Sequence, residues 1–366
     1  MKNSSPPDYI LLGIASAIIF CGLFSLASAS SIGSETRFIG QIIFGFLPGI
    51  MIAFILYKIP LHVIQKISPY LLFLNIILLA IIVLPFFSEI VQVTRGSGRW
   101  ITIGSFSIQP SEFLKISFVL YIASWLISKT KKQTKDCKKS IKELLLPFLI
   151  ISGLIAVLLE RQPDLSTLVI VLVTGFIVYF IAKTPLWHTF AIAGIAITLF
   201  SIFILTSPYR VERMKTILDP TSDILESTHH AWQMTIAVGS GGLFGKGIGM
   251  SMQKYGYVPL PASDSIFAIY AEETGFIGSV LLILLFLLFF WRGFLIAKNN
   301  KNDFARLIVF GIVSWIFLQM TVNVFAAIGG PVTGVPLPLI SHGKSHLIAE
   351  LAGIGLMLNA SKYIKK

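Results

Sequence analysis

Ten stretches of mainly apolar residues follow one another along the chain, each close to the length of a membrane-spanning helix. A helix needs about 20 such residues to cross a bilayer. Backbone in the bilayer has no water to bond, and these stretches lack the two-residue alternation of barrel strands, so helix is the predicted structure. The expected spans are Tyr9–Ala29, Phe38–Tyr57, Tyr70–Phe87, Glu112–Ile127, Leu145–Leu159, Leu165–Ala182, Trp187–Thr206, Ile266–Phe290, Phe304–Ile328 and Leu339–Leu358.

The composition agrees with a membrane protein. Of the 366 residues, 55% are hydrophobic and 13% are charged, and the mean hydropathy is +0.83. Soluble domains carry about 25% charged residues, so this chain has too little polar surface to face water on all sides. We therefore predict an all-α integral membrane protein of about ten transmembrane helices, with residues 1–366 forming one polytopic membrane domain.

The net charge of +12 does not indicate nucleic-acid binding, because the basic residues are spread over short loops rather than along one face. Their distribution instead predicts orientation, since Lys and Arg concentrate in cytoplasmic loops. The lysine-rich segment 129–142 and the C-terminal segment 362–366 fall on one side only if the number of spans is even. Both termini are therefore expected in the cytoplasm.

Two polar stretches, 88–111 and 207–265, lie on the predicted outer side. The second forms a long extracytoplasmic loop between the seventh and eighth helices. A structureless loop of that length is usually functional. The active face is therefore expected to be extracytoplasmic.

The glycine-rich run Gly239–Gly249 within the long loop has two interpretations. It is not a Walker sequence, and no strand precedes it. The plainer interpretation is a flexible re-entrant turn or a helix break. In the other, its backbone amides and Lys246 approach a lipid-linked pyrophosphate, because unpaired N–H groups at such turns favour anions.

Asp264 lies just before the eighth apolar stretch. Asp is a common helix N-cap, and a carboxylate at the membrane surface beside a basic loop can also act as a general base. The two roles are compatible. Glu272 and Glu273 lie two turns further on, where charge is costly and usually paired or functional. We expect them to be structural partners of a buried Arg rather than catalysts.

The first outer stretch places a cation, an aromatic ring and a carboxylate close together, in Arg99, Trp100 and Glu112. Trp at such a position most often anchors a protein at the membrane interface. Glu112 and Lys115 are three residues apart on one predicted helix face, which predicts an ion pair.

A second charged cluster, Arg161 with Asp164, flanks a predicted helix break at Gln162-Pro163. This Arg/Asp pair is expected to hold the architecture rather than to react. His342 and His346 are four residues apart at the start of the last span, but a pattern of two ligands does not identify a metal.

Six motifs occur in a fixed order along nearly the whole chain. They are Gly98–Ile101 with Gln109–Glu112, Arg161–Asp164, Tyr209-Arg210 through Asp219-Pro220, Gly239–Gly249, Asp264–Gly275 and Thr333–Ser341. Together they resemble the SEDS family (shape, elongation, division and sporulation), the polytopic cell-wall polymerases typified by FtsW and RodA.

The resemblance implies a ten-helix peptidoglycan glycosyltransferase of the bacterial cytoplasmic (inner) membrane. Its substrate would be lipid II, an undecaprenyl-linked disaccharide, polymerised into glycan strands during cell division or elongation. Asp264 matches the family's essential outer-loop aspartate, and Trp100 and Glu112 match residues that line its central cavity. The resemblance also implies a class B penicillin-binding protein as partner, with a single span that packs against the bundle.

The implied reaction joins a sugar hydroxyl to a lipid-linked sugar, and pyrophosphate is the leaving group. As general base, Asp264 would accelerate it by about 10²–10⁴-fold. Arg99, Arg210, Lys246 and Lys254 are the candidate residues for binding the pyrophosphate, with or without a divalent cation. A single displacement would invert the anomeric centre.

The chain departs from the family pattern near its last helix. Many relatives read Ser-Tyr-Gly-Gly-Ser-Ser where this chain has Ser341–His346, so Lys344 and His346 replace small residues. These changes either perturb packing or add a contact to a lipid phosphate. Segments 25–31 and 209–220 favour the FtsW-like division branch, whereas 332–338 fits the elongation branch equally well.

Two other functions are compatible with the sequence. A lipid II flippase would also carry buried charges at broken helices. Transport needs polar access from both sides of the membrane, however, and here the polar groups crowd one side. A non-catalytic scaffold of the wall-synthesis complex predicts that Asp264→Asn leaves growth unchanged.

Overall fold

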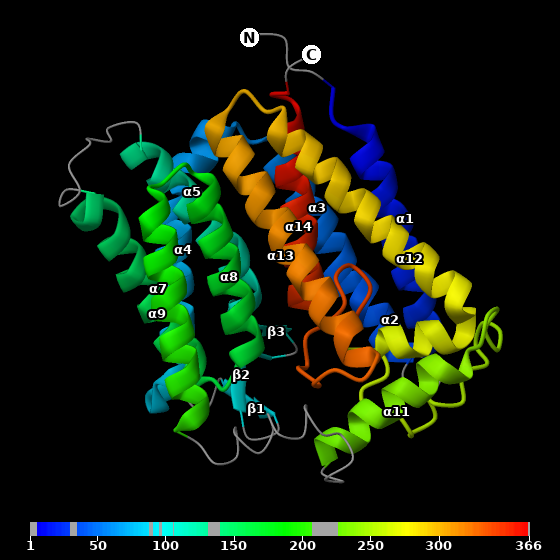
Figure 1. The fold of residues 1–366 in the computed structure, drawn as a ribbon. Helices are drawn as coiled ribbons and strands as arrows, with labels where there is room; N and C mark the ends of the chain where they lie inside the picture. The colour runs from blue at the N-terminus through cyan, green and yellow to red at the C-terminus, as the bar shows by residue number, and fades with distance from the viewer. Residues whose placement is uncertain are drawn as a thin grey trace.

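The computed structural model describes residues 6–29, 35–87, 91–94, 97–104, 106–130, 140–206 and 226–364. Helices dominate the fold (Figure 1). In chain order the elements are α1 (Tyr9–Ala29), α2 (Glu35–Gln41), η1 (Ile42–Phe46), α3 (Leu47–Lys58), α4 (Leu61–Val83), η2 (Pro85–Phe87), β1 (Val91–Thr94), β2 (Ser97–Ile103), β3 (Phe106–Ile108), α5 (Pro110–Thr130), η3 (Ile141–Leu145), α7 (Leu146–Arg161), α8 (Leu165–Ile181), α9 (Leu186–Leu205), α11 (Glu226–Ser240), α12 (Ile266–Lys298), α13 (Asp303–Ala327) and α14 (Lys344–Ser361).

Several of these helices have the length and composition of membrane spans. Two further apolar helices, α8 and α9, are shorter, and α14 overlaps the tenth expected span. The prediction of a multi-pass helical membrane protein is therefore confirmed, while the count of ten spans and the position of the long loop stay predictions. Among the described residues the seven long apolar segments are Tyr9–Ala29, Phe38–Lys58, Leu61–Val83, Pro110–Thr130, Ile141–Arg161, Ile266–Lys298 and Asp303–Ala327.

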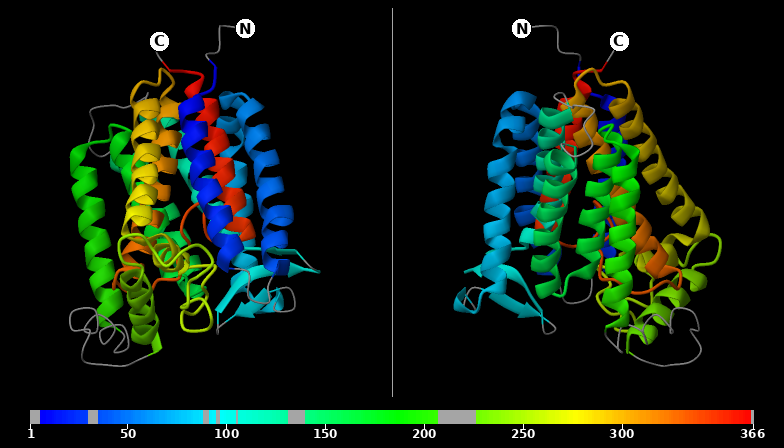
Figure 2. Two further views of the ribbon diagram at one scale, coloured as in Figure 1. Left: turned by 90° about the vertical axis from the view of Figure 1, so that its right-hand side faces the viewer. Right: turned by 60° about the vertical axis from the view of Figure 1, so that its left-hand side comes forward.

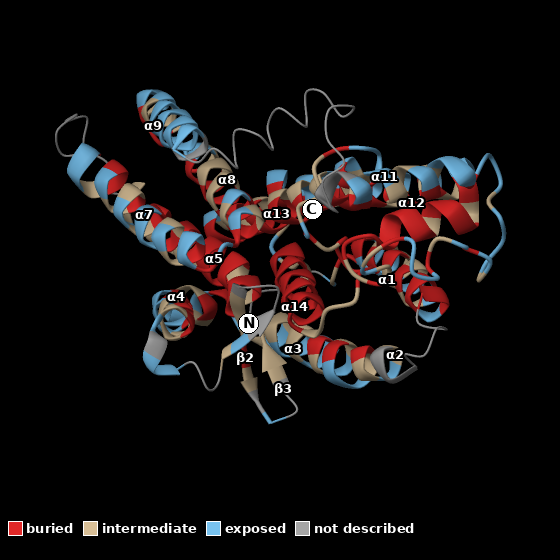
Figure 3. Ribbon diagram, turned by 90° about the horizontal axis from the view of Figure 1, so that it is seen from below, coloured by how far each residue is buried: buried red, intermediate tan, exposed pale blue. Residues whose placement is uncertain are grey.

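The centre of the bundle is formed by α5, α13 and α14. These helices are buried along most of their length, whereas α4, α7 and α9 lie at the rim (Figure 3). The rim helices expose large apolar side chains, such as Phe190 on α9 with 76% of its surface exposed. In a bilayer such side chains meet lipid tails, which are as apolar as the side chains themselves.

The first outer stretch contains a small antiparallel sheet, so the all-α prediction is wrong for this part of the chain. β1 pairs with β2, and β2 pairs with β3. Gln92 faces Trp100 in the first pair, and Ile101 faces Ile108 in the second. Strands with open edges need water to bond them, so a sheet of this kind is expected outside the hydrocarbon.

The long predicted loop is not structureless, because α11 occupies part of it. α11 packs against α12 and α13 and buries Met234 and Ala237. Figure 2 shows α11 at the same end of the bundle as the sheet. The described parts of the two polar stretches therefore share one end of the molecule.

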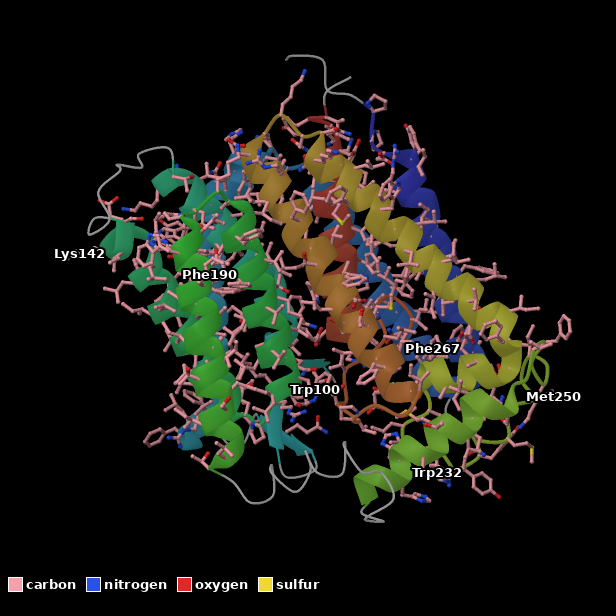
Figure 4. The ribbon with its side chains drawn as sticks, viewed as in Figure 1. Trp100, Lys142, Phe190, Trp232, Met250 and Phe267 are labelled. Atoms are coloured by element: carbon pink, nitrogen blue, oxygen red, sulfur yellow. The ribbon has the colours of Figure 1, made fainter. Side chains whose placement is uncertain are left out.

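The first and last described helices are joined at the opposite end (Figure 1). The backbone N–H of Asp8 donates to Oγ of Ser361 at 3.0 Å, and Arg292 forms an ion pair with Asp8 at 2.8 Å. Lys142, from the lysine-rich segment, lies in the half of the molecule that holds these ends (Figure 4).

Helices α3 and α14 approach each other closely because each carries a glycine at the contact. A Cβ on Gly355 would lie 2.3 Å from the carbonyl oxygen of Ala53, and one on Gly49 would lie 2.5 Å from Cδ1 of Leu351. Small residues at helix contacts let backbones approach in membrane proteins. Since α14 also forms a wall of the cavity described below, this contact helps to fix that wall.

Substitution Gly355→Ala is expected to destabilise the protein by about 1–3 kcal/mol, since the added methyl group has no room against Ala53. The measurement is thermal unfolding in detergent. Gly153→Ala on α7 is the matched control, because no atom lies within 4 Å of its added Cβ and alanine favours helix. Equal stability of the Gly355→Ala protein and the control would contradict the tight contact.

Candidate functional site

A cavity of about 150 Å³ lies beside β2. Its walls come from β2, the first turns of α5, α8 and α14, and the segment 328–343 between α13 and α14. Trp100 lies between α8 and this segment (Figure 4). The side chains on which the cavity's chemistry depends are Arg99, Trp100, Glu112, Lys115, Asp164 and His346. Three predicted site residues, Arg99, Trp100 and Glu112, are thus brought together.

Arg99 is held at the more exposed edge of the cavity by the turn between α7 and α8. Its Nε donates to the carbonyl of Gln162 at 3.2 Å, and a terminal nitrogen donates to the carbonyl of Pro163. A cation at the C-terminal end of a helix is favourable because the helix dipole places partial negative charge there. Arg99 therefore fastens the sheet to the helical bundle while it faces the cavity.

The predicted ion pair between Glu112 and Lys115 is present in the structure. The two groups are 2.8 Å apart, and each residue is 3% exposed. Nζ of Lys115 also donates to Oε1 of Gln319 at 3.0 Å and lies 5.3 Å from the ring centroid of Trp315. Glu112 therefore brings a carboxylate to the cavity whose charge is already compensated.

Gln319 on α13 was not predicted as part of this site, although it joins three of its walls. It accepts from Nε1 of Trp315 at 2.7 Å and donates to the carbonyl of Pro336 and to Oε1 of Glu350, both at 3.1 Å. The signal was available in the sequence, because an amide or a carboxylate inside an apolar span is usually functional or paired. Gln319 and Glu350 both fit that description.

Asp164 does not use Arg161 as its partner, which corrects the expectation for this charged pair. Its carboxylate accepts from the backbone N–H of Thr167 at 3.4 Å and from the hydroxyl of Ser111 at 3.2 Å. Arg161 is exposed. Asp164 thus caps α8 and ties it to α5. This role is structural, as expected for Asp164, although its partner is not Arg161.

Asp264 lies beside the cavity, two residues before the first residue of α12, Ile266. The N-cap of α12 is Ser265, so Asp264 does not occupy the capping position considered for it. A Cβ on Gly334 would lie 3.9 Å from Oδ2 of Asp264. Gly334 and Ser263 line the cavity, and Asp264 itself is 8% exposed. The predicted base is therefore beside the cavity and largely shielded from solvent.

The start of α12 is fastened to the segment 328–343 by side-chain hydrogen bonds. The amide nitrogen of Asn323 donates to the carbonyls of Asp264 and Val335, both at 2.8 Å. The hydroxyl of Ser341 donates to the carbonyl of Ser263 at 2.6 Å. These bonds hold Asp264 in a fixed position relative to the cavity wall.

Lys246 and Lys254 lie outside the cavity wall, in ion pairs with the two glutamates of α12. Lys246 is 2.6 Å from Glu272, and Lys254 is 3.1 Å from Glu273. The expectation that a buried Arg pairs with these glutamates is therefore wrong. Lys254 is 3% exposed and also donates to Oγ of Ser28 at 3.0 Å. Arg210, the remaining predicted cation, lies outside the described residues.

The glycine-rich run folds as a turn packed on α12, which agrees with the plainer of its two interpretations. The N–H groups of Lys246 and Gly247 donate to the carbonyls of Glu272 and Glu273, at 3.0 and 3.1 Å. A Cβ on Gly245 would lie 2.1 Å from the carbonyl oxygen of Glu273, so only glycine permits this approach. These amides donate to backbone carbonyls of the protein and do not point toward an anion site.

The described residues hold no group of three or more His, Cys, Asp or Glu side chains placed to bind a metal ion. His346 and Glu350 are close to one another, at 3.4 Å, but form only a pair. The described residues therefore identify no site for a divalent cation, and no step proposed below depends on one.

The fold and cavity define the chain as a polytopic helical membrane protein with a polar cavity at one end and the carboxylate of Asp264 beside that cavity. It belongs to the FtsW/RodA/SpoVE family, whose members are described as cell cycle proteins and whose sequence model matches residues 8–366. The resemblance to the SEDS family is thereby confirmed.

Curated relatives match nearly the whole chain. Stage V sporulation protein E of Bacillus subtilis is 34% identical, over 99% of this chain and 98% of that protein. The probable peptidoglycan glycosyltransferase FtsW of Hydrogenovibrio crunogenus is 37% identical, over 96% and 91%. Peptidoglycan glycosyltransferase MrdB of Escherichia coli is 32% identical, over 98% and 94%.

Solved structures share the fold. A chain from work on "structural coordination of polymerization and crosslinking by a peptidoglycan synthase complex" has a TM-score of 0.79 and 27% identity, with 97% of each chain covered. The rod shape determining protein RodA of Thermus thermophilus has a TM-score of 0.70 and 26% identity, with 98% of each chain covered. The similarity therefore extends over the complete helical bundle.

Removal of one partner from the buried pair of Glu273 and Lys254 is expected to be costly. Glu273→Gln leaves the ammonium of Lys254 buried without a counter-charge and should lower the free energy of unfolding by about 3–5 kcal/mol. The double variant with Lys254→Met should recover much of that loss, because neither charge is then buried. Thermal unfolding in detergent measures both.

The control for this series is Asp303→Asn, which breaks the more exposed pair of Asp303 with Arg306. Its effect should stay within about 1 kcal/mol, as for surface ion pairs in general. If Glu273→Gln proved no more harmful than this control, the buried pair would not be important for stability.

Proposed function

We propose that this chain is a peptidoglycan glycosyltransferase that polymerises lipid II into glycan strands. The observation that carries the proposal is the match of the whole chain to relatives named as such enzymes, at 32–37% identity. The placement of Asp264 beside a polar cavity supports it, since a transferase needs a base next to the space that receives its substrates.

In the proposed reaction, the carboxylate of Asp264 accepts the proton of an acceptor sugar hydroxyl as the oxygen attacks the anomeric carbon of the donor. The bond from that carbon to the pyrophosphate breaks, and the lipid pyrophosphate leaves with the electron pair. One displacement inverts the anomeric centre. Burial of Asp264 supports the role because few water molecules then compete with the acceptor hydroxyl.

Charge that develops on the pyrophosphate needs cations. Of the four predicted, Arg99 lines the cavity and is bonded only to carbonyl oxygens among its described contacts, so its positive charge is still available. Lys246 and Lys254 are neutralised by carboxylates. Arg99 is therefore the proposed pyrophosphate ligand at the cavity, and Arg210 keeps the role that its motif implies.

In the proposed topology, ten helices cross the inner membrane, both termini are cytoplasmic and the cavity faces outward. Contact between Asp8 and Ser361 supports an even number of spans, because the chain must return to the side from which it starts. The sheet and α11 lie at the end opposite the termini (Figure 2), which supports placing residues 91–108 outside.

A class B penicillin-binding protein is the proposed partner, and division is the proposed setting. The similarity to a chain from a peptidoglycan synthase complex supports such a partner. FtsW proteins among the relatives support division. Co-purification in mild detergent is the direct test of the partner.

Asp264→Asn is expected to lower lipid II polymerisation by about 10²–10⁴-fold, because the amide cannot accept the acceptor's proton. Polymerisation of purified lipid II with the partner present measures this effect. The matched control is Asp303→Asn, the same substitution at a site far from the cavity. Equal glycan from Asp264→Asn and wild type would remove Asp264 from the mechanism, whereas no glycan from either would favour a flippase or a scaffold.

The proposed topology predicts which residues a membrane-impermeant maleimide can reach on intact cells. In a background without Cys21 and Cys137, Gln92→Cys on the sheet should be labelled and Lys142→Cys should not, since both positions are exposed in the protein. Labelling of Lys142→Cys with protection of Gln92→Cys would mean that the orientation is reversed.

A further inference from the structure

The inner part of the cavity contains hydrogen-bonding groups that the protein does not use. His346, in the first turn of α14, lines the cavity and is 3% exposed. Within the part of the chain that the structure describes, neither of its ring nitrogens has a hydrogen-bond partner. Nδ1 lies 3.4 Å from Oε2 of Glu350, close enough for an electrostatic contact. A buried polar group usually has a partner, so a ligand is the natural acceptor and donor here.

A second such group faces the same cavity from another element. Thr333, in the segment between α13 and α14, has a buried hydroxyl oxygen without a hydrogen-bond partner among the described residues. Its backbone is held in place, because the hydroxyl of Ser166 donates to its carbonyl at 2.8 Å. Two fixed groups on separate walls, one hydroxyl and one imidazole, can thus both donate and accept.

The charges of the inner cavity compensate one another. Glu112 pairs with Lys115, and Asp164 is occupied by Ser111 and the first turn of α8. Arg99, the cavity cation that is not paired with a carboxylate, lies at the more exposed edge. A pyrophosphate placed deep in the cavity would meet two carboxylates and gain little from them. A neutral ligand with several hydroxyl groups fits this inner region better.

The size and the aromatic wall agree with a sugar. A volume of about 150 Å³ is below the roughly 300–1,000 Å³ of pockets that enclose drug-sized ligands, which favours one sugar ring over a complete disaccharide. Trp100 supplies an apolar ring face against which the C–H face of a pyranose can pack.

We infer that the inner cavity binds one sugar ring of the lipid-linked substrate, and that His346 and Thr333 hydrogen-bond its hydroxyl or acetamido groups. The inference rests on the proposed function and deepens it, because it assigns the saccharide to the inner cavity and the pyrophosphate to the edge beside Arg99. His346 and Thr333 are thus the proposed specificity-determining contacts to the sugar.

The test compares two ligands that share a lipid tail and pyrophosphate but differ in the sugars: lipid II and undecaprenyl pyrophosphate. Binding of each to full-length protein is measured in the Asp264→Asn background, where turnover is slowed, for the chain with His346, His346→Ser and His346→Gln. Loss of the imidazole should weaken lipid II binding about tenfold, as expected for one or two net hydrogen bonds. Binding of undecaprenyl pyrophosphate should not change.

His346→Gln, which keeps a donor and an acceptor, should recover most of the lipid II affinity, and Thr333→Val should repeat the selective loss. The control is His62→Ser, the same change at an exposed histidine of α4 outside the cavity. Thermal unfolding of each variant separates a folding defect from a lost contact, and the ratio of the two affinities is insensitive to a fraction of unfolded protein.

Equal weakening of both ligands by His346→Ser would overturn the inference, because the contact would then be to the pyrophosphate or the tail. Unchanged lipid II affinity would also overturn it and would leave ordered water as the partner of these groups. Neither result would affect lipid II polymerisation by the wild-type protein, so the proposed function would not be contradicted. Absence of lipid II binding and of polymerisation in wild type would overturn both.

Discussion

The break in α12 at Gly275 is the constraint on which one end of the molecule depends. Gly275 has φ 70° and ψ −167°, so the amides that follow it lose their partners within the helix. An amide left without a hydrogen-bond partner away from water is costly. The carbonyls of Gly242 and Leu243 accept from Phe276 and Ile277, at 2.8 and 3.2 Å. The glycine-rich turn is therefore needed to complete the hydrogen bonding of a broken helix.

The same break turns the first part of α12 into the support of the site. Glu272 and Glu273 lie just before it, and their pairs with Lys246 and Lys254 hold the turn against the helix. The short arm before the break begins at Ile266. Asp264 lies two residues before it, and the backbone carbonyl of Asp264 accepts from Asn323. Ion pairs at the break and a hydrogen bond at the start of the arm thus fasten both ends of the arm that carries Asp264.

How much of this could be predicted from the sequence depends on the range of the interaction. Apolar length located the helices, and a spacing of three residues predicted the pair of Glu112 and Lys115, because both signals are local. The partners of Lys246 and Lys254 lie 26 and 19 residues further along the chain. Such separations match no helical or strand periodicity, so the sequence pattern does not predict these pairs. The fold alone brings them together.

The residues of the site that are close in sequence could be predicted, whereas the contacts made by residues far apart in sequence could not. Arg99, Trp100 and Glu112 come from neighbouring segments, and they do meet at one cavity. Thr333 belongs to a motif and Gln319 interrupts an apolar span, but the partners of both side chains depend on how α13 and the segment after it pack, which sequence spacing does not reveal. The sheet was not predicted because its strands are only 3 to 7 residues long and lie between strong apolar signals.

The joining of the two ends of the chain has a consequence for the order of assembly in the cell. α1 is made long before α12, on which it mainly packs, and Ser28 near the end of α1 donates to Glu273, 245 residues later. Asp8 meets Ser361 across 353 residues. During synthesis α1 therefore cannot reach its final packing until α12 (Ile266–Lys298) has been made. Packing of α1 against α12 is therefore a late step in the assembly of the described bundle.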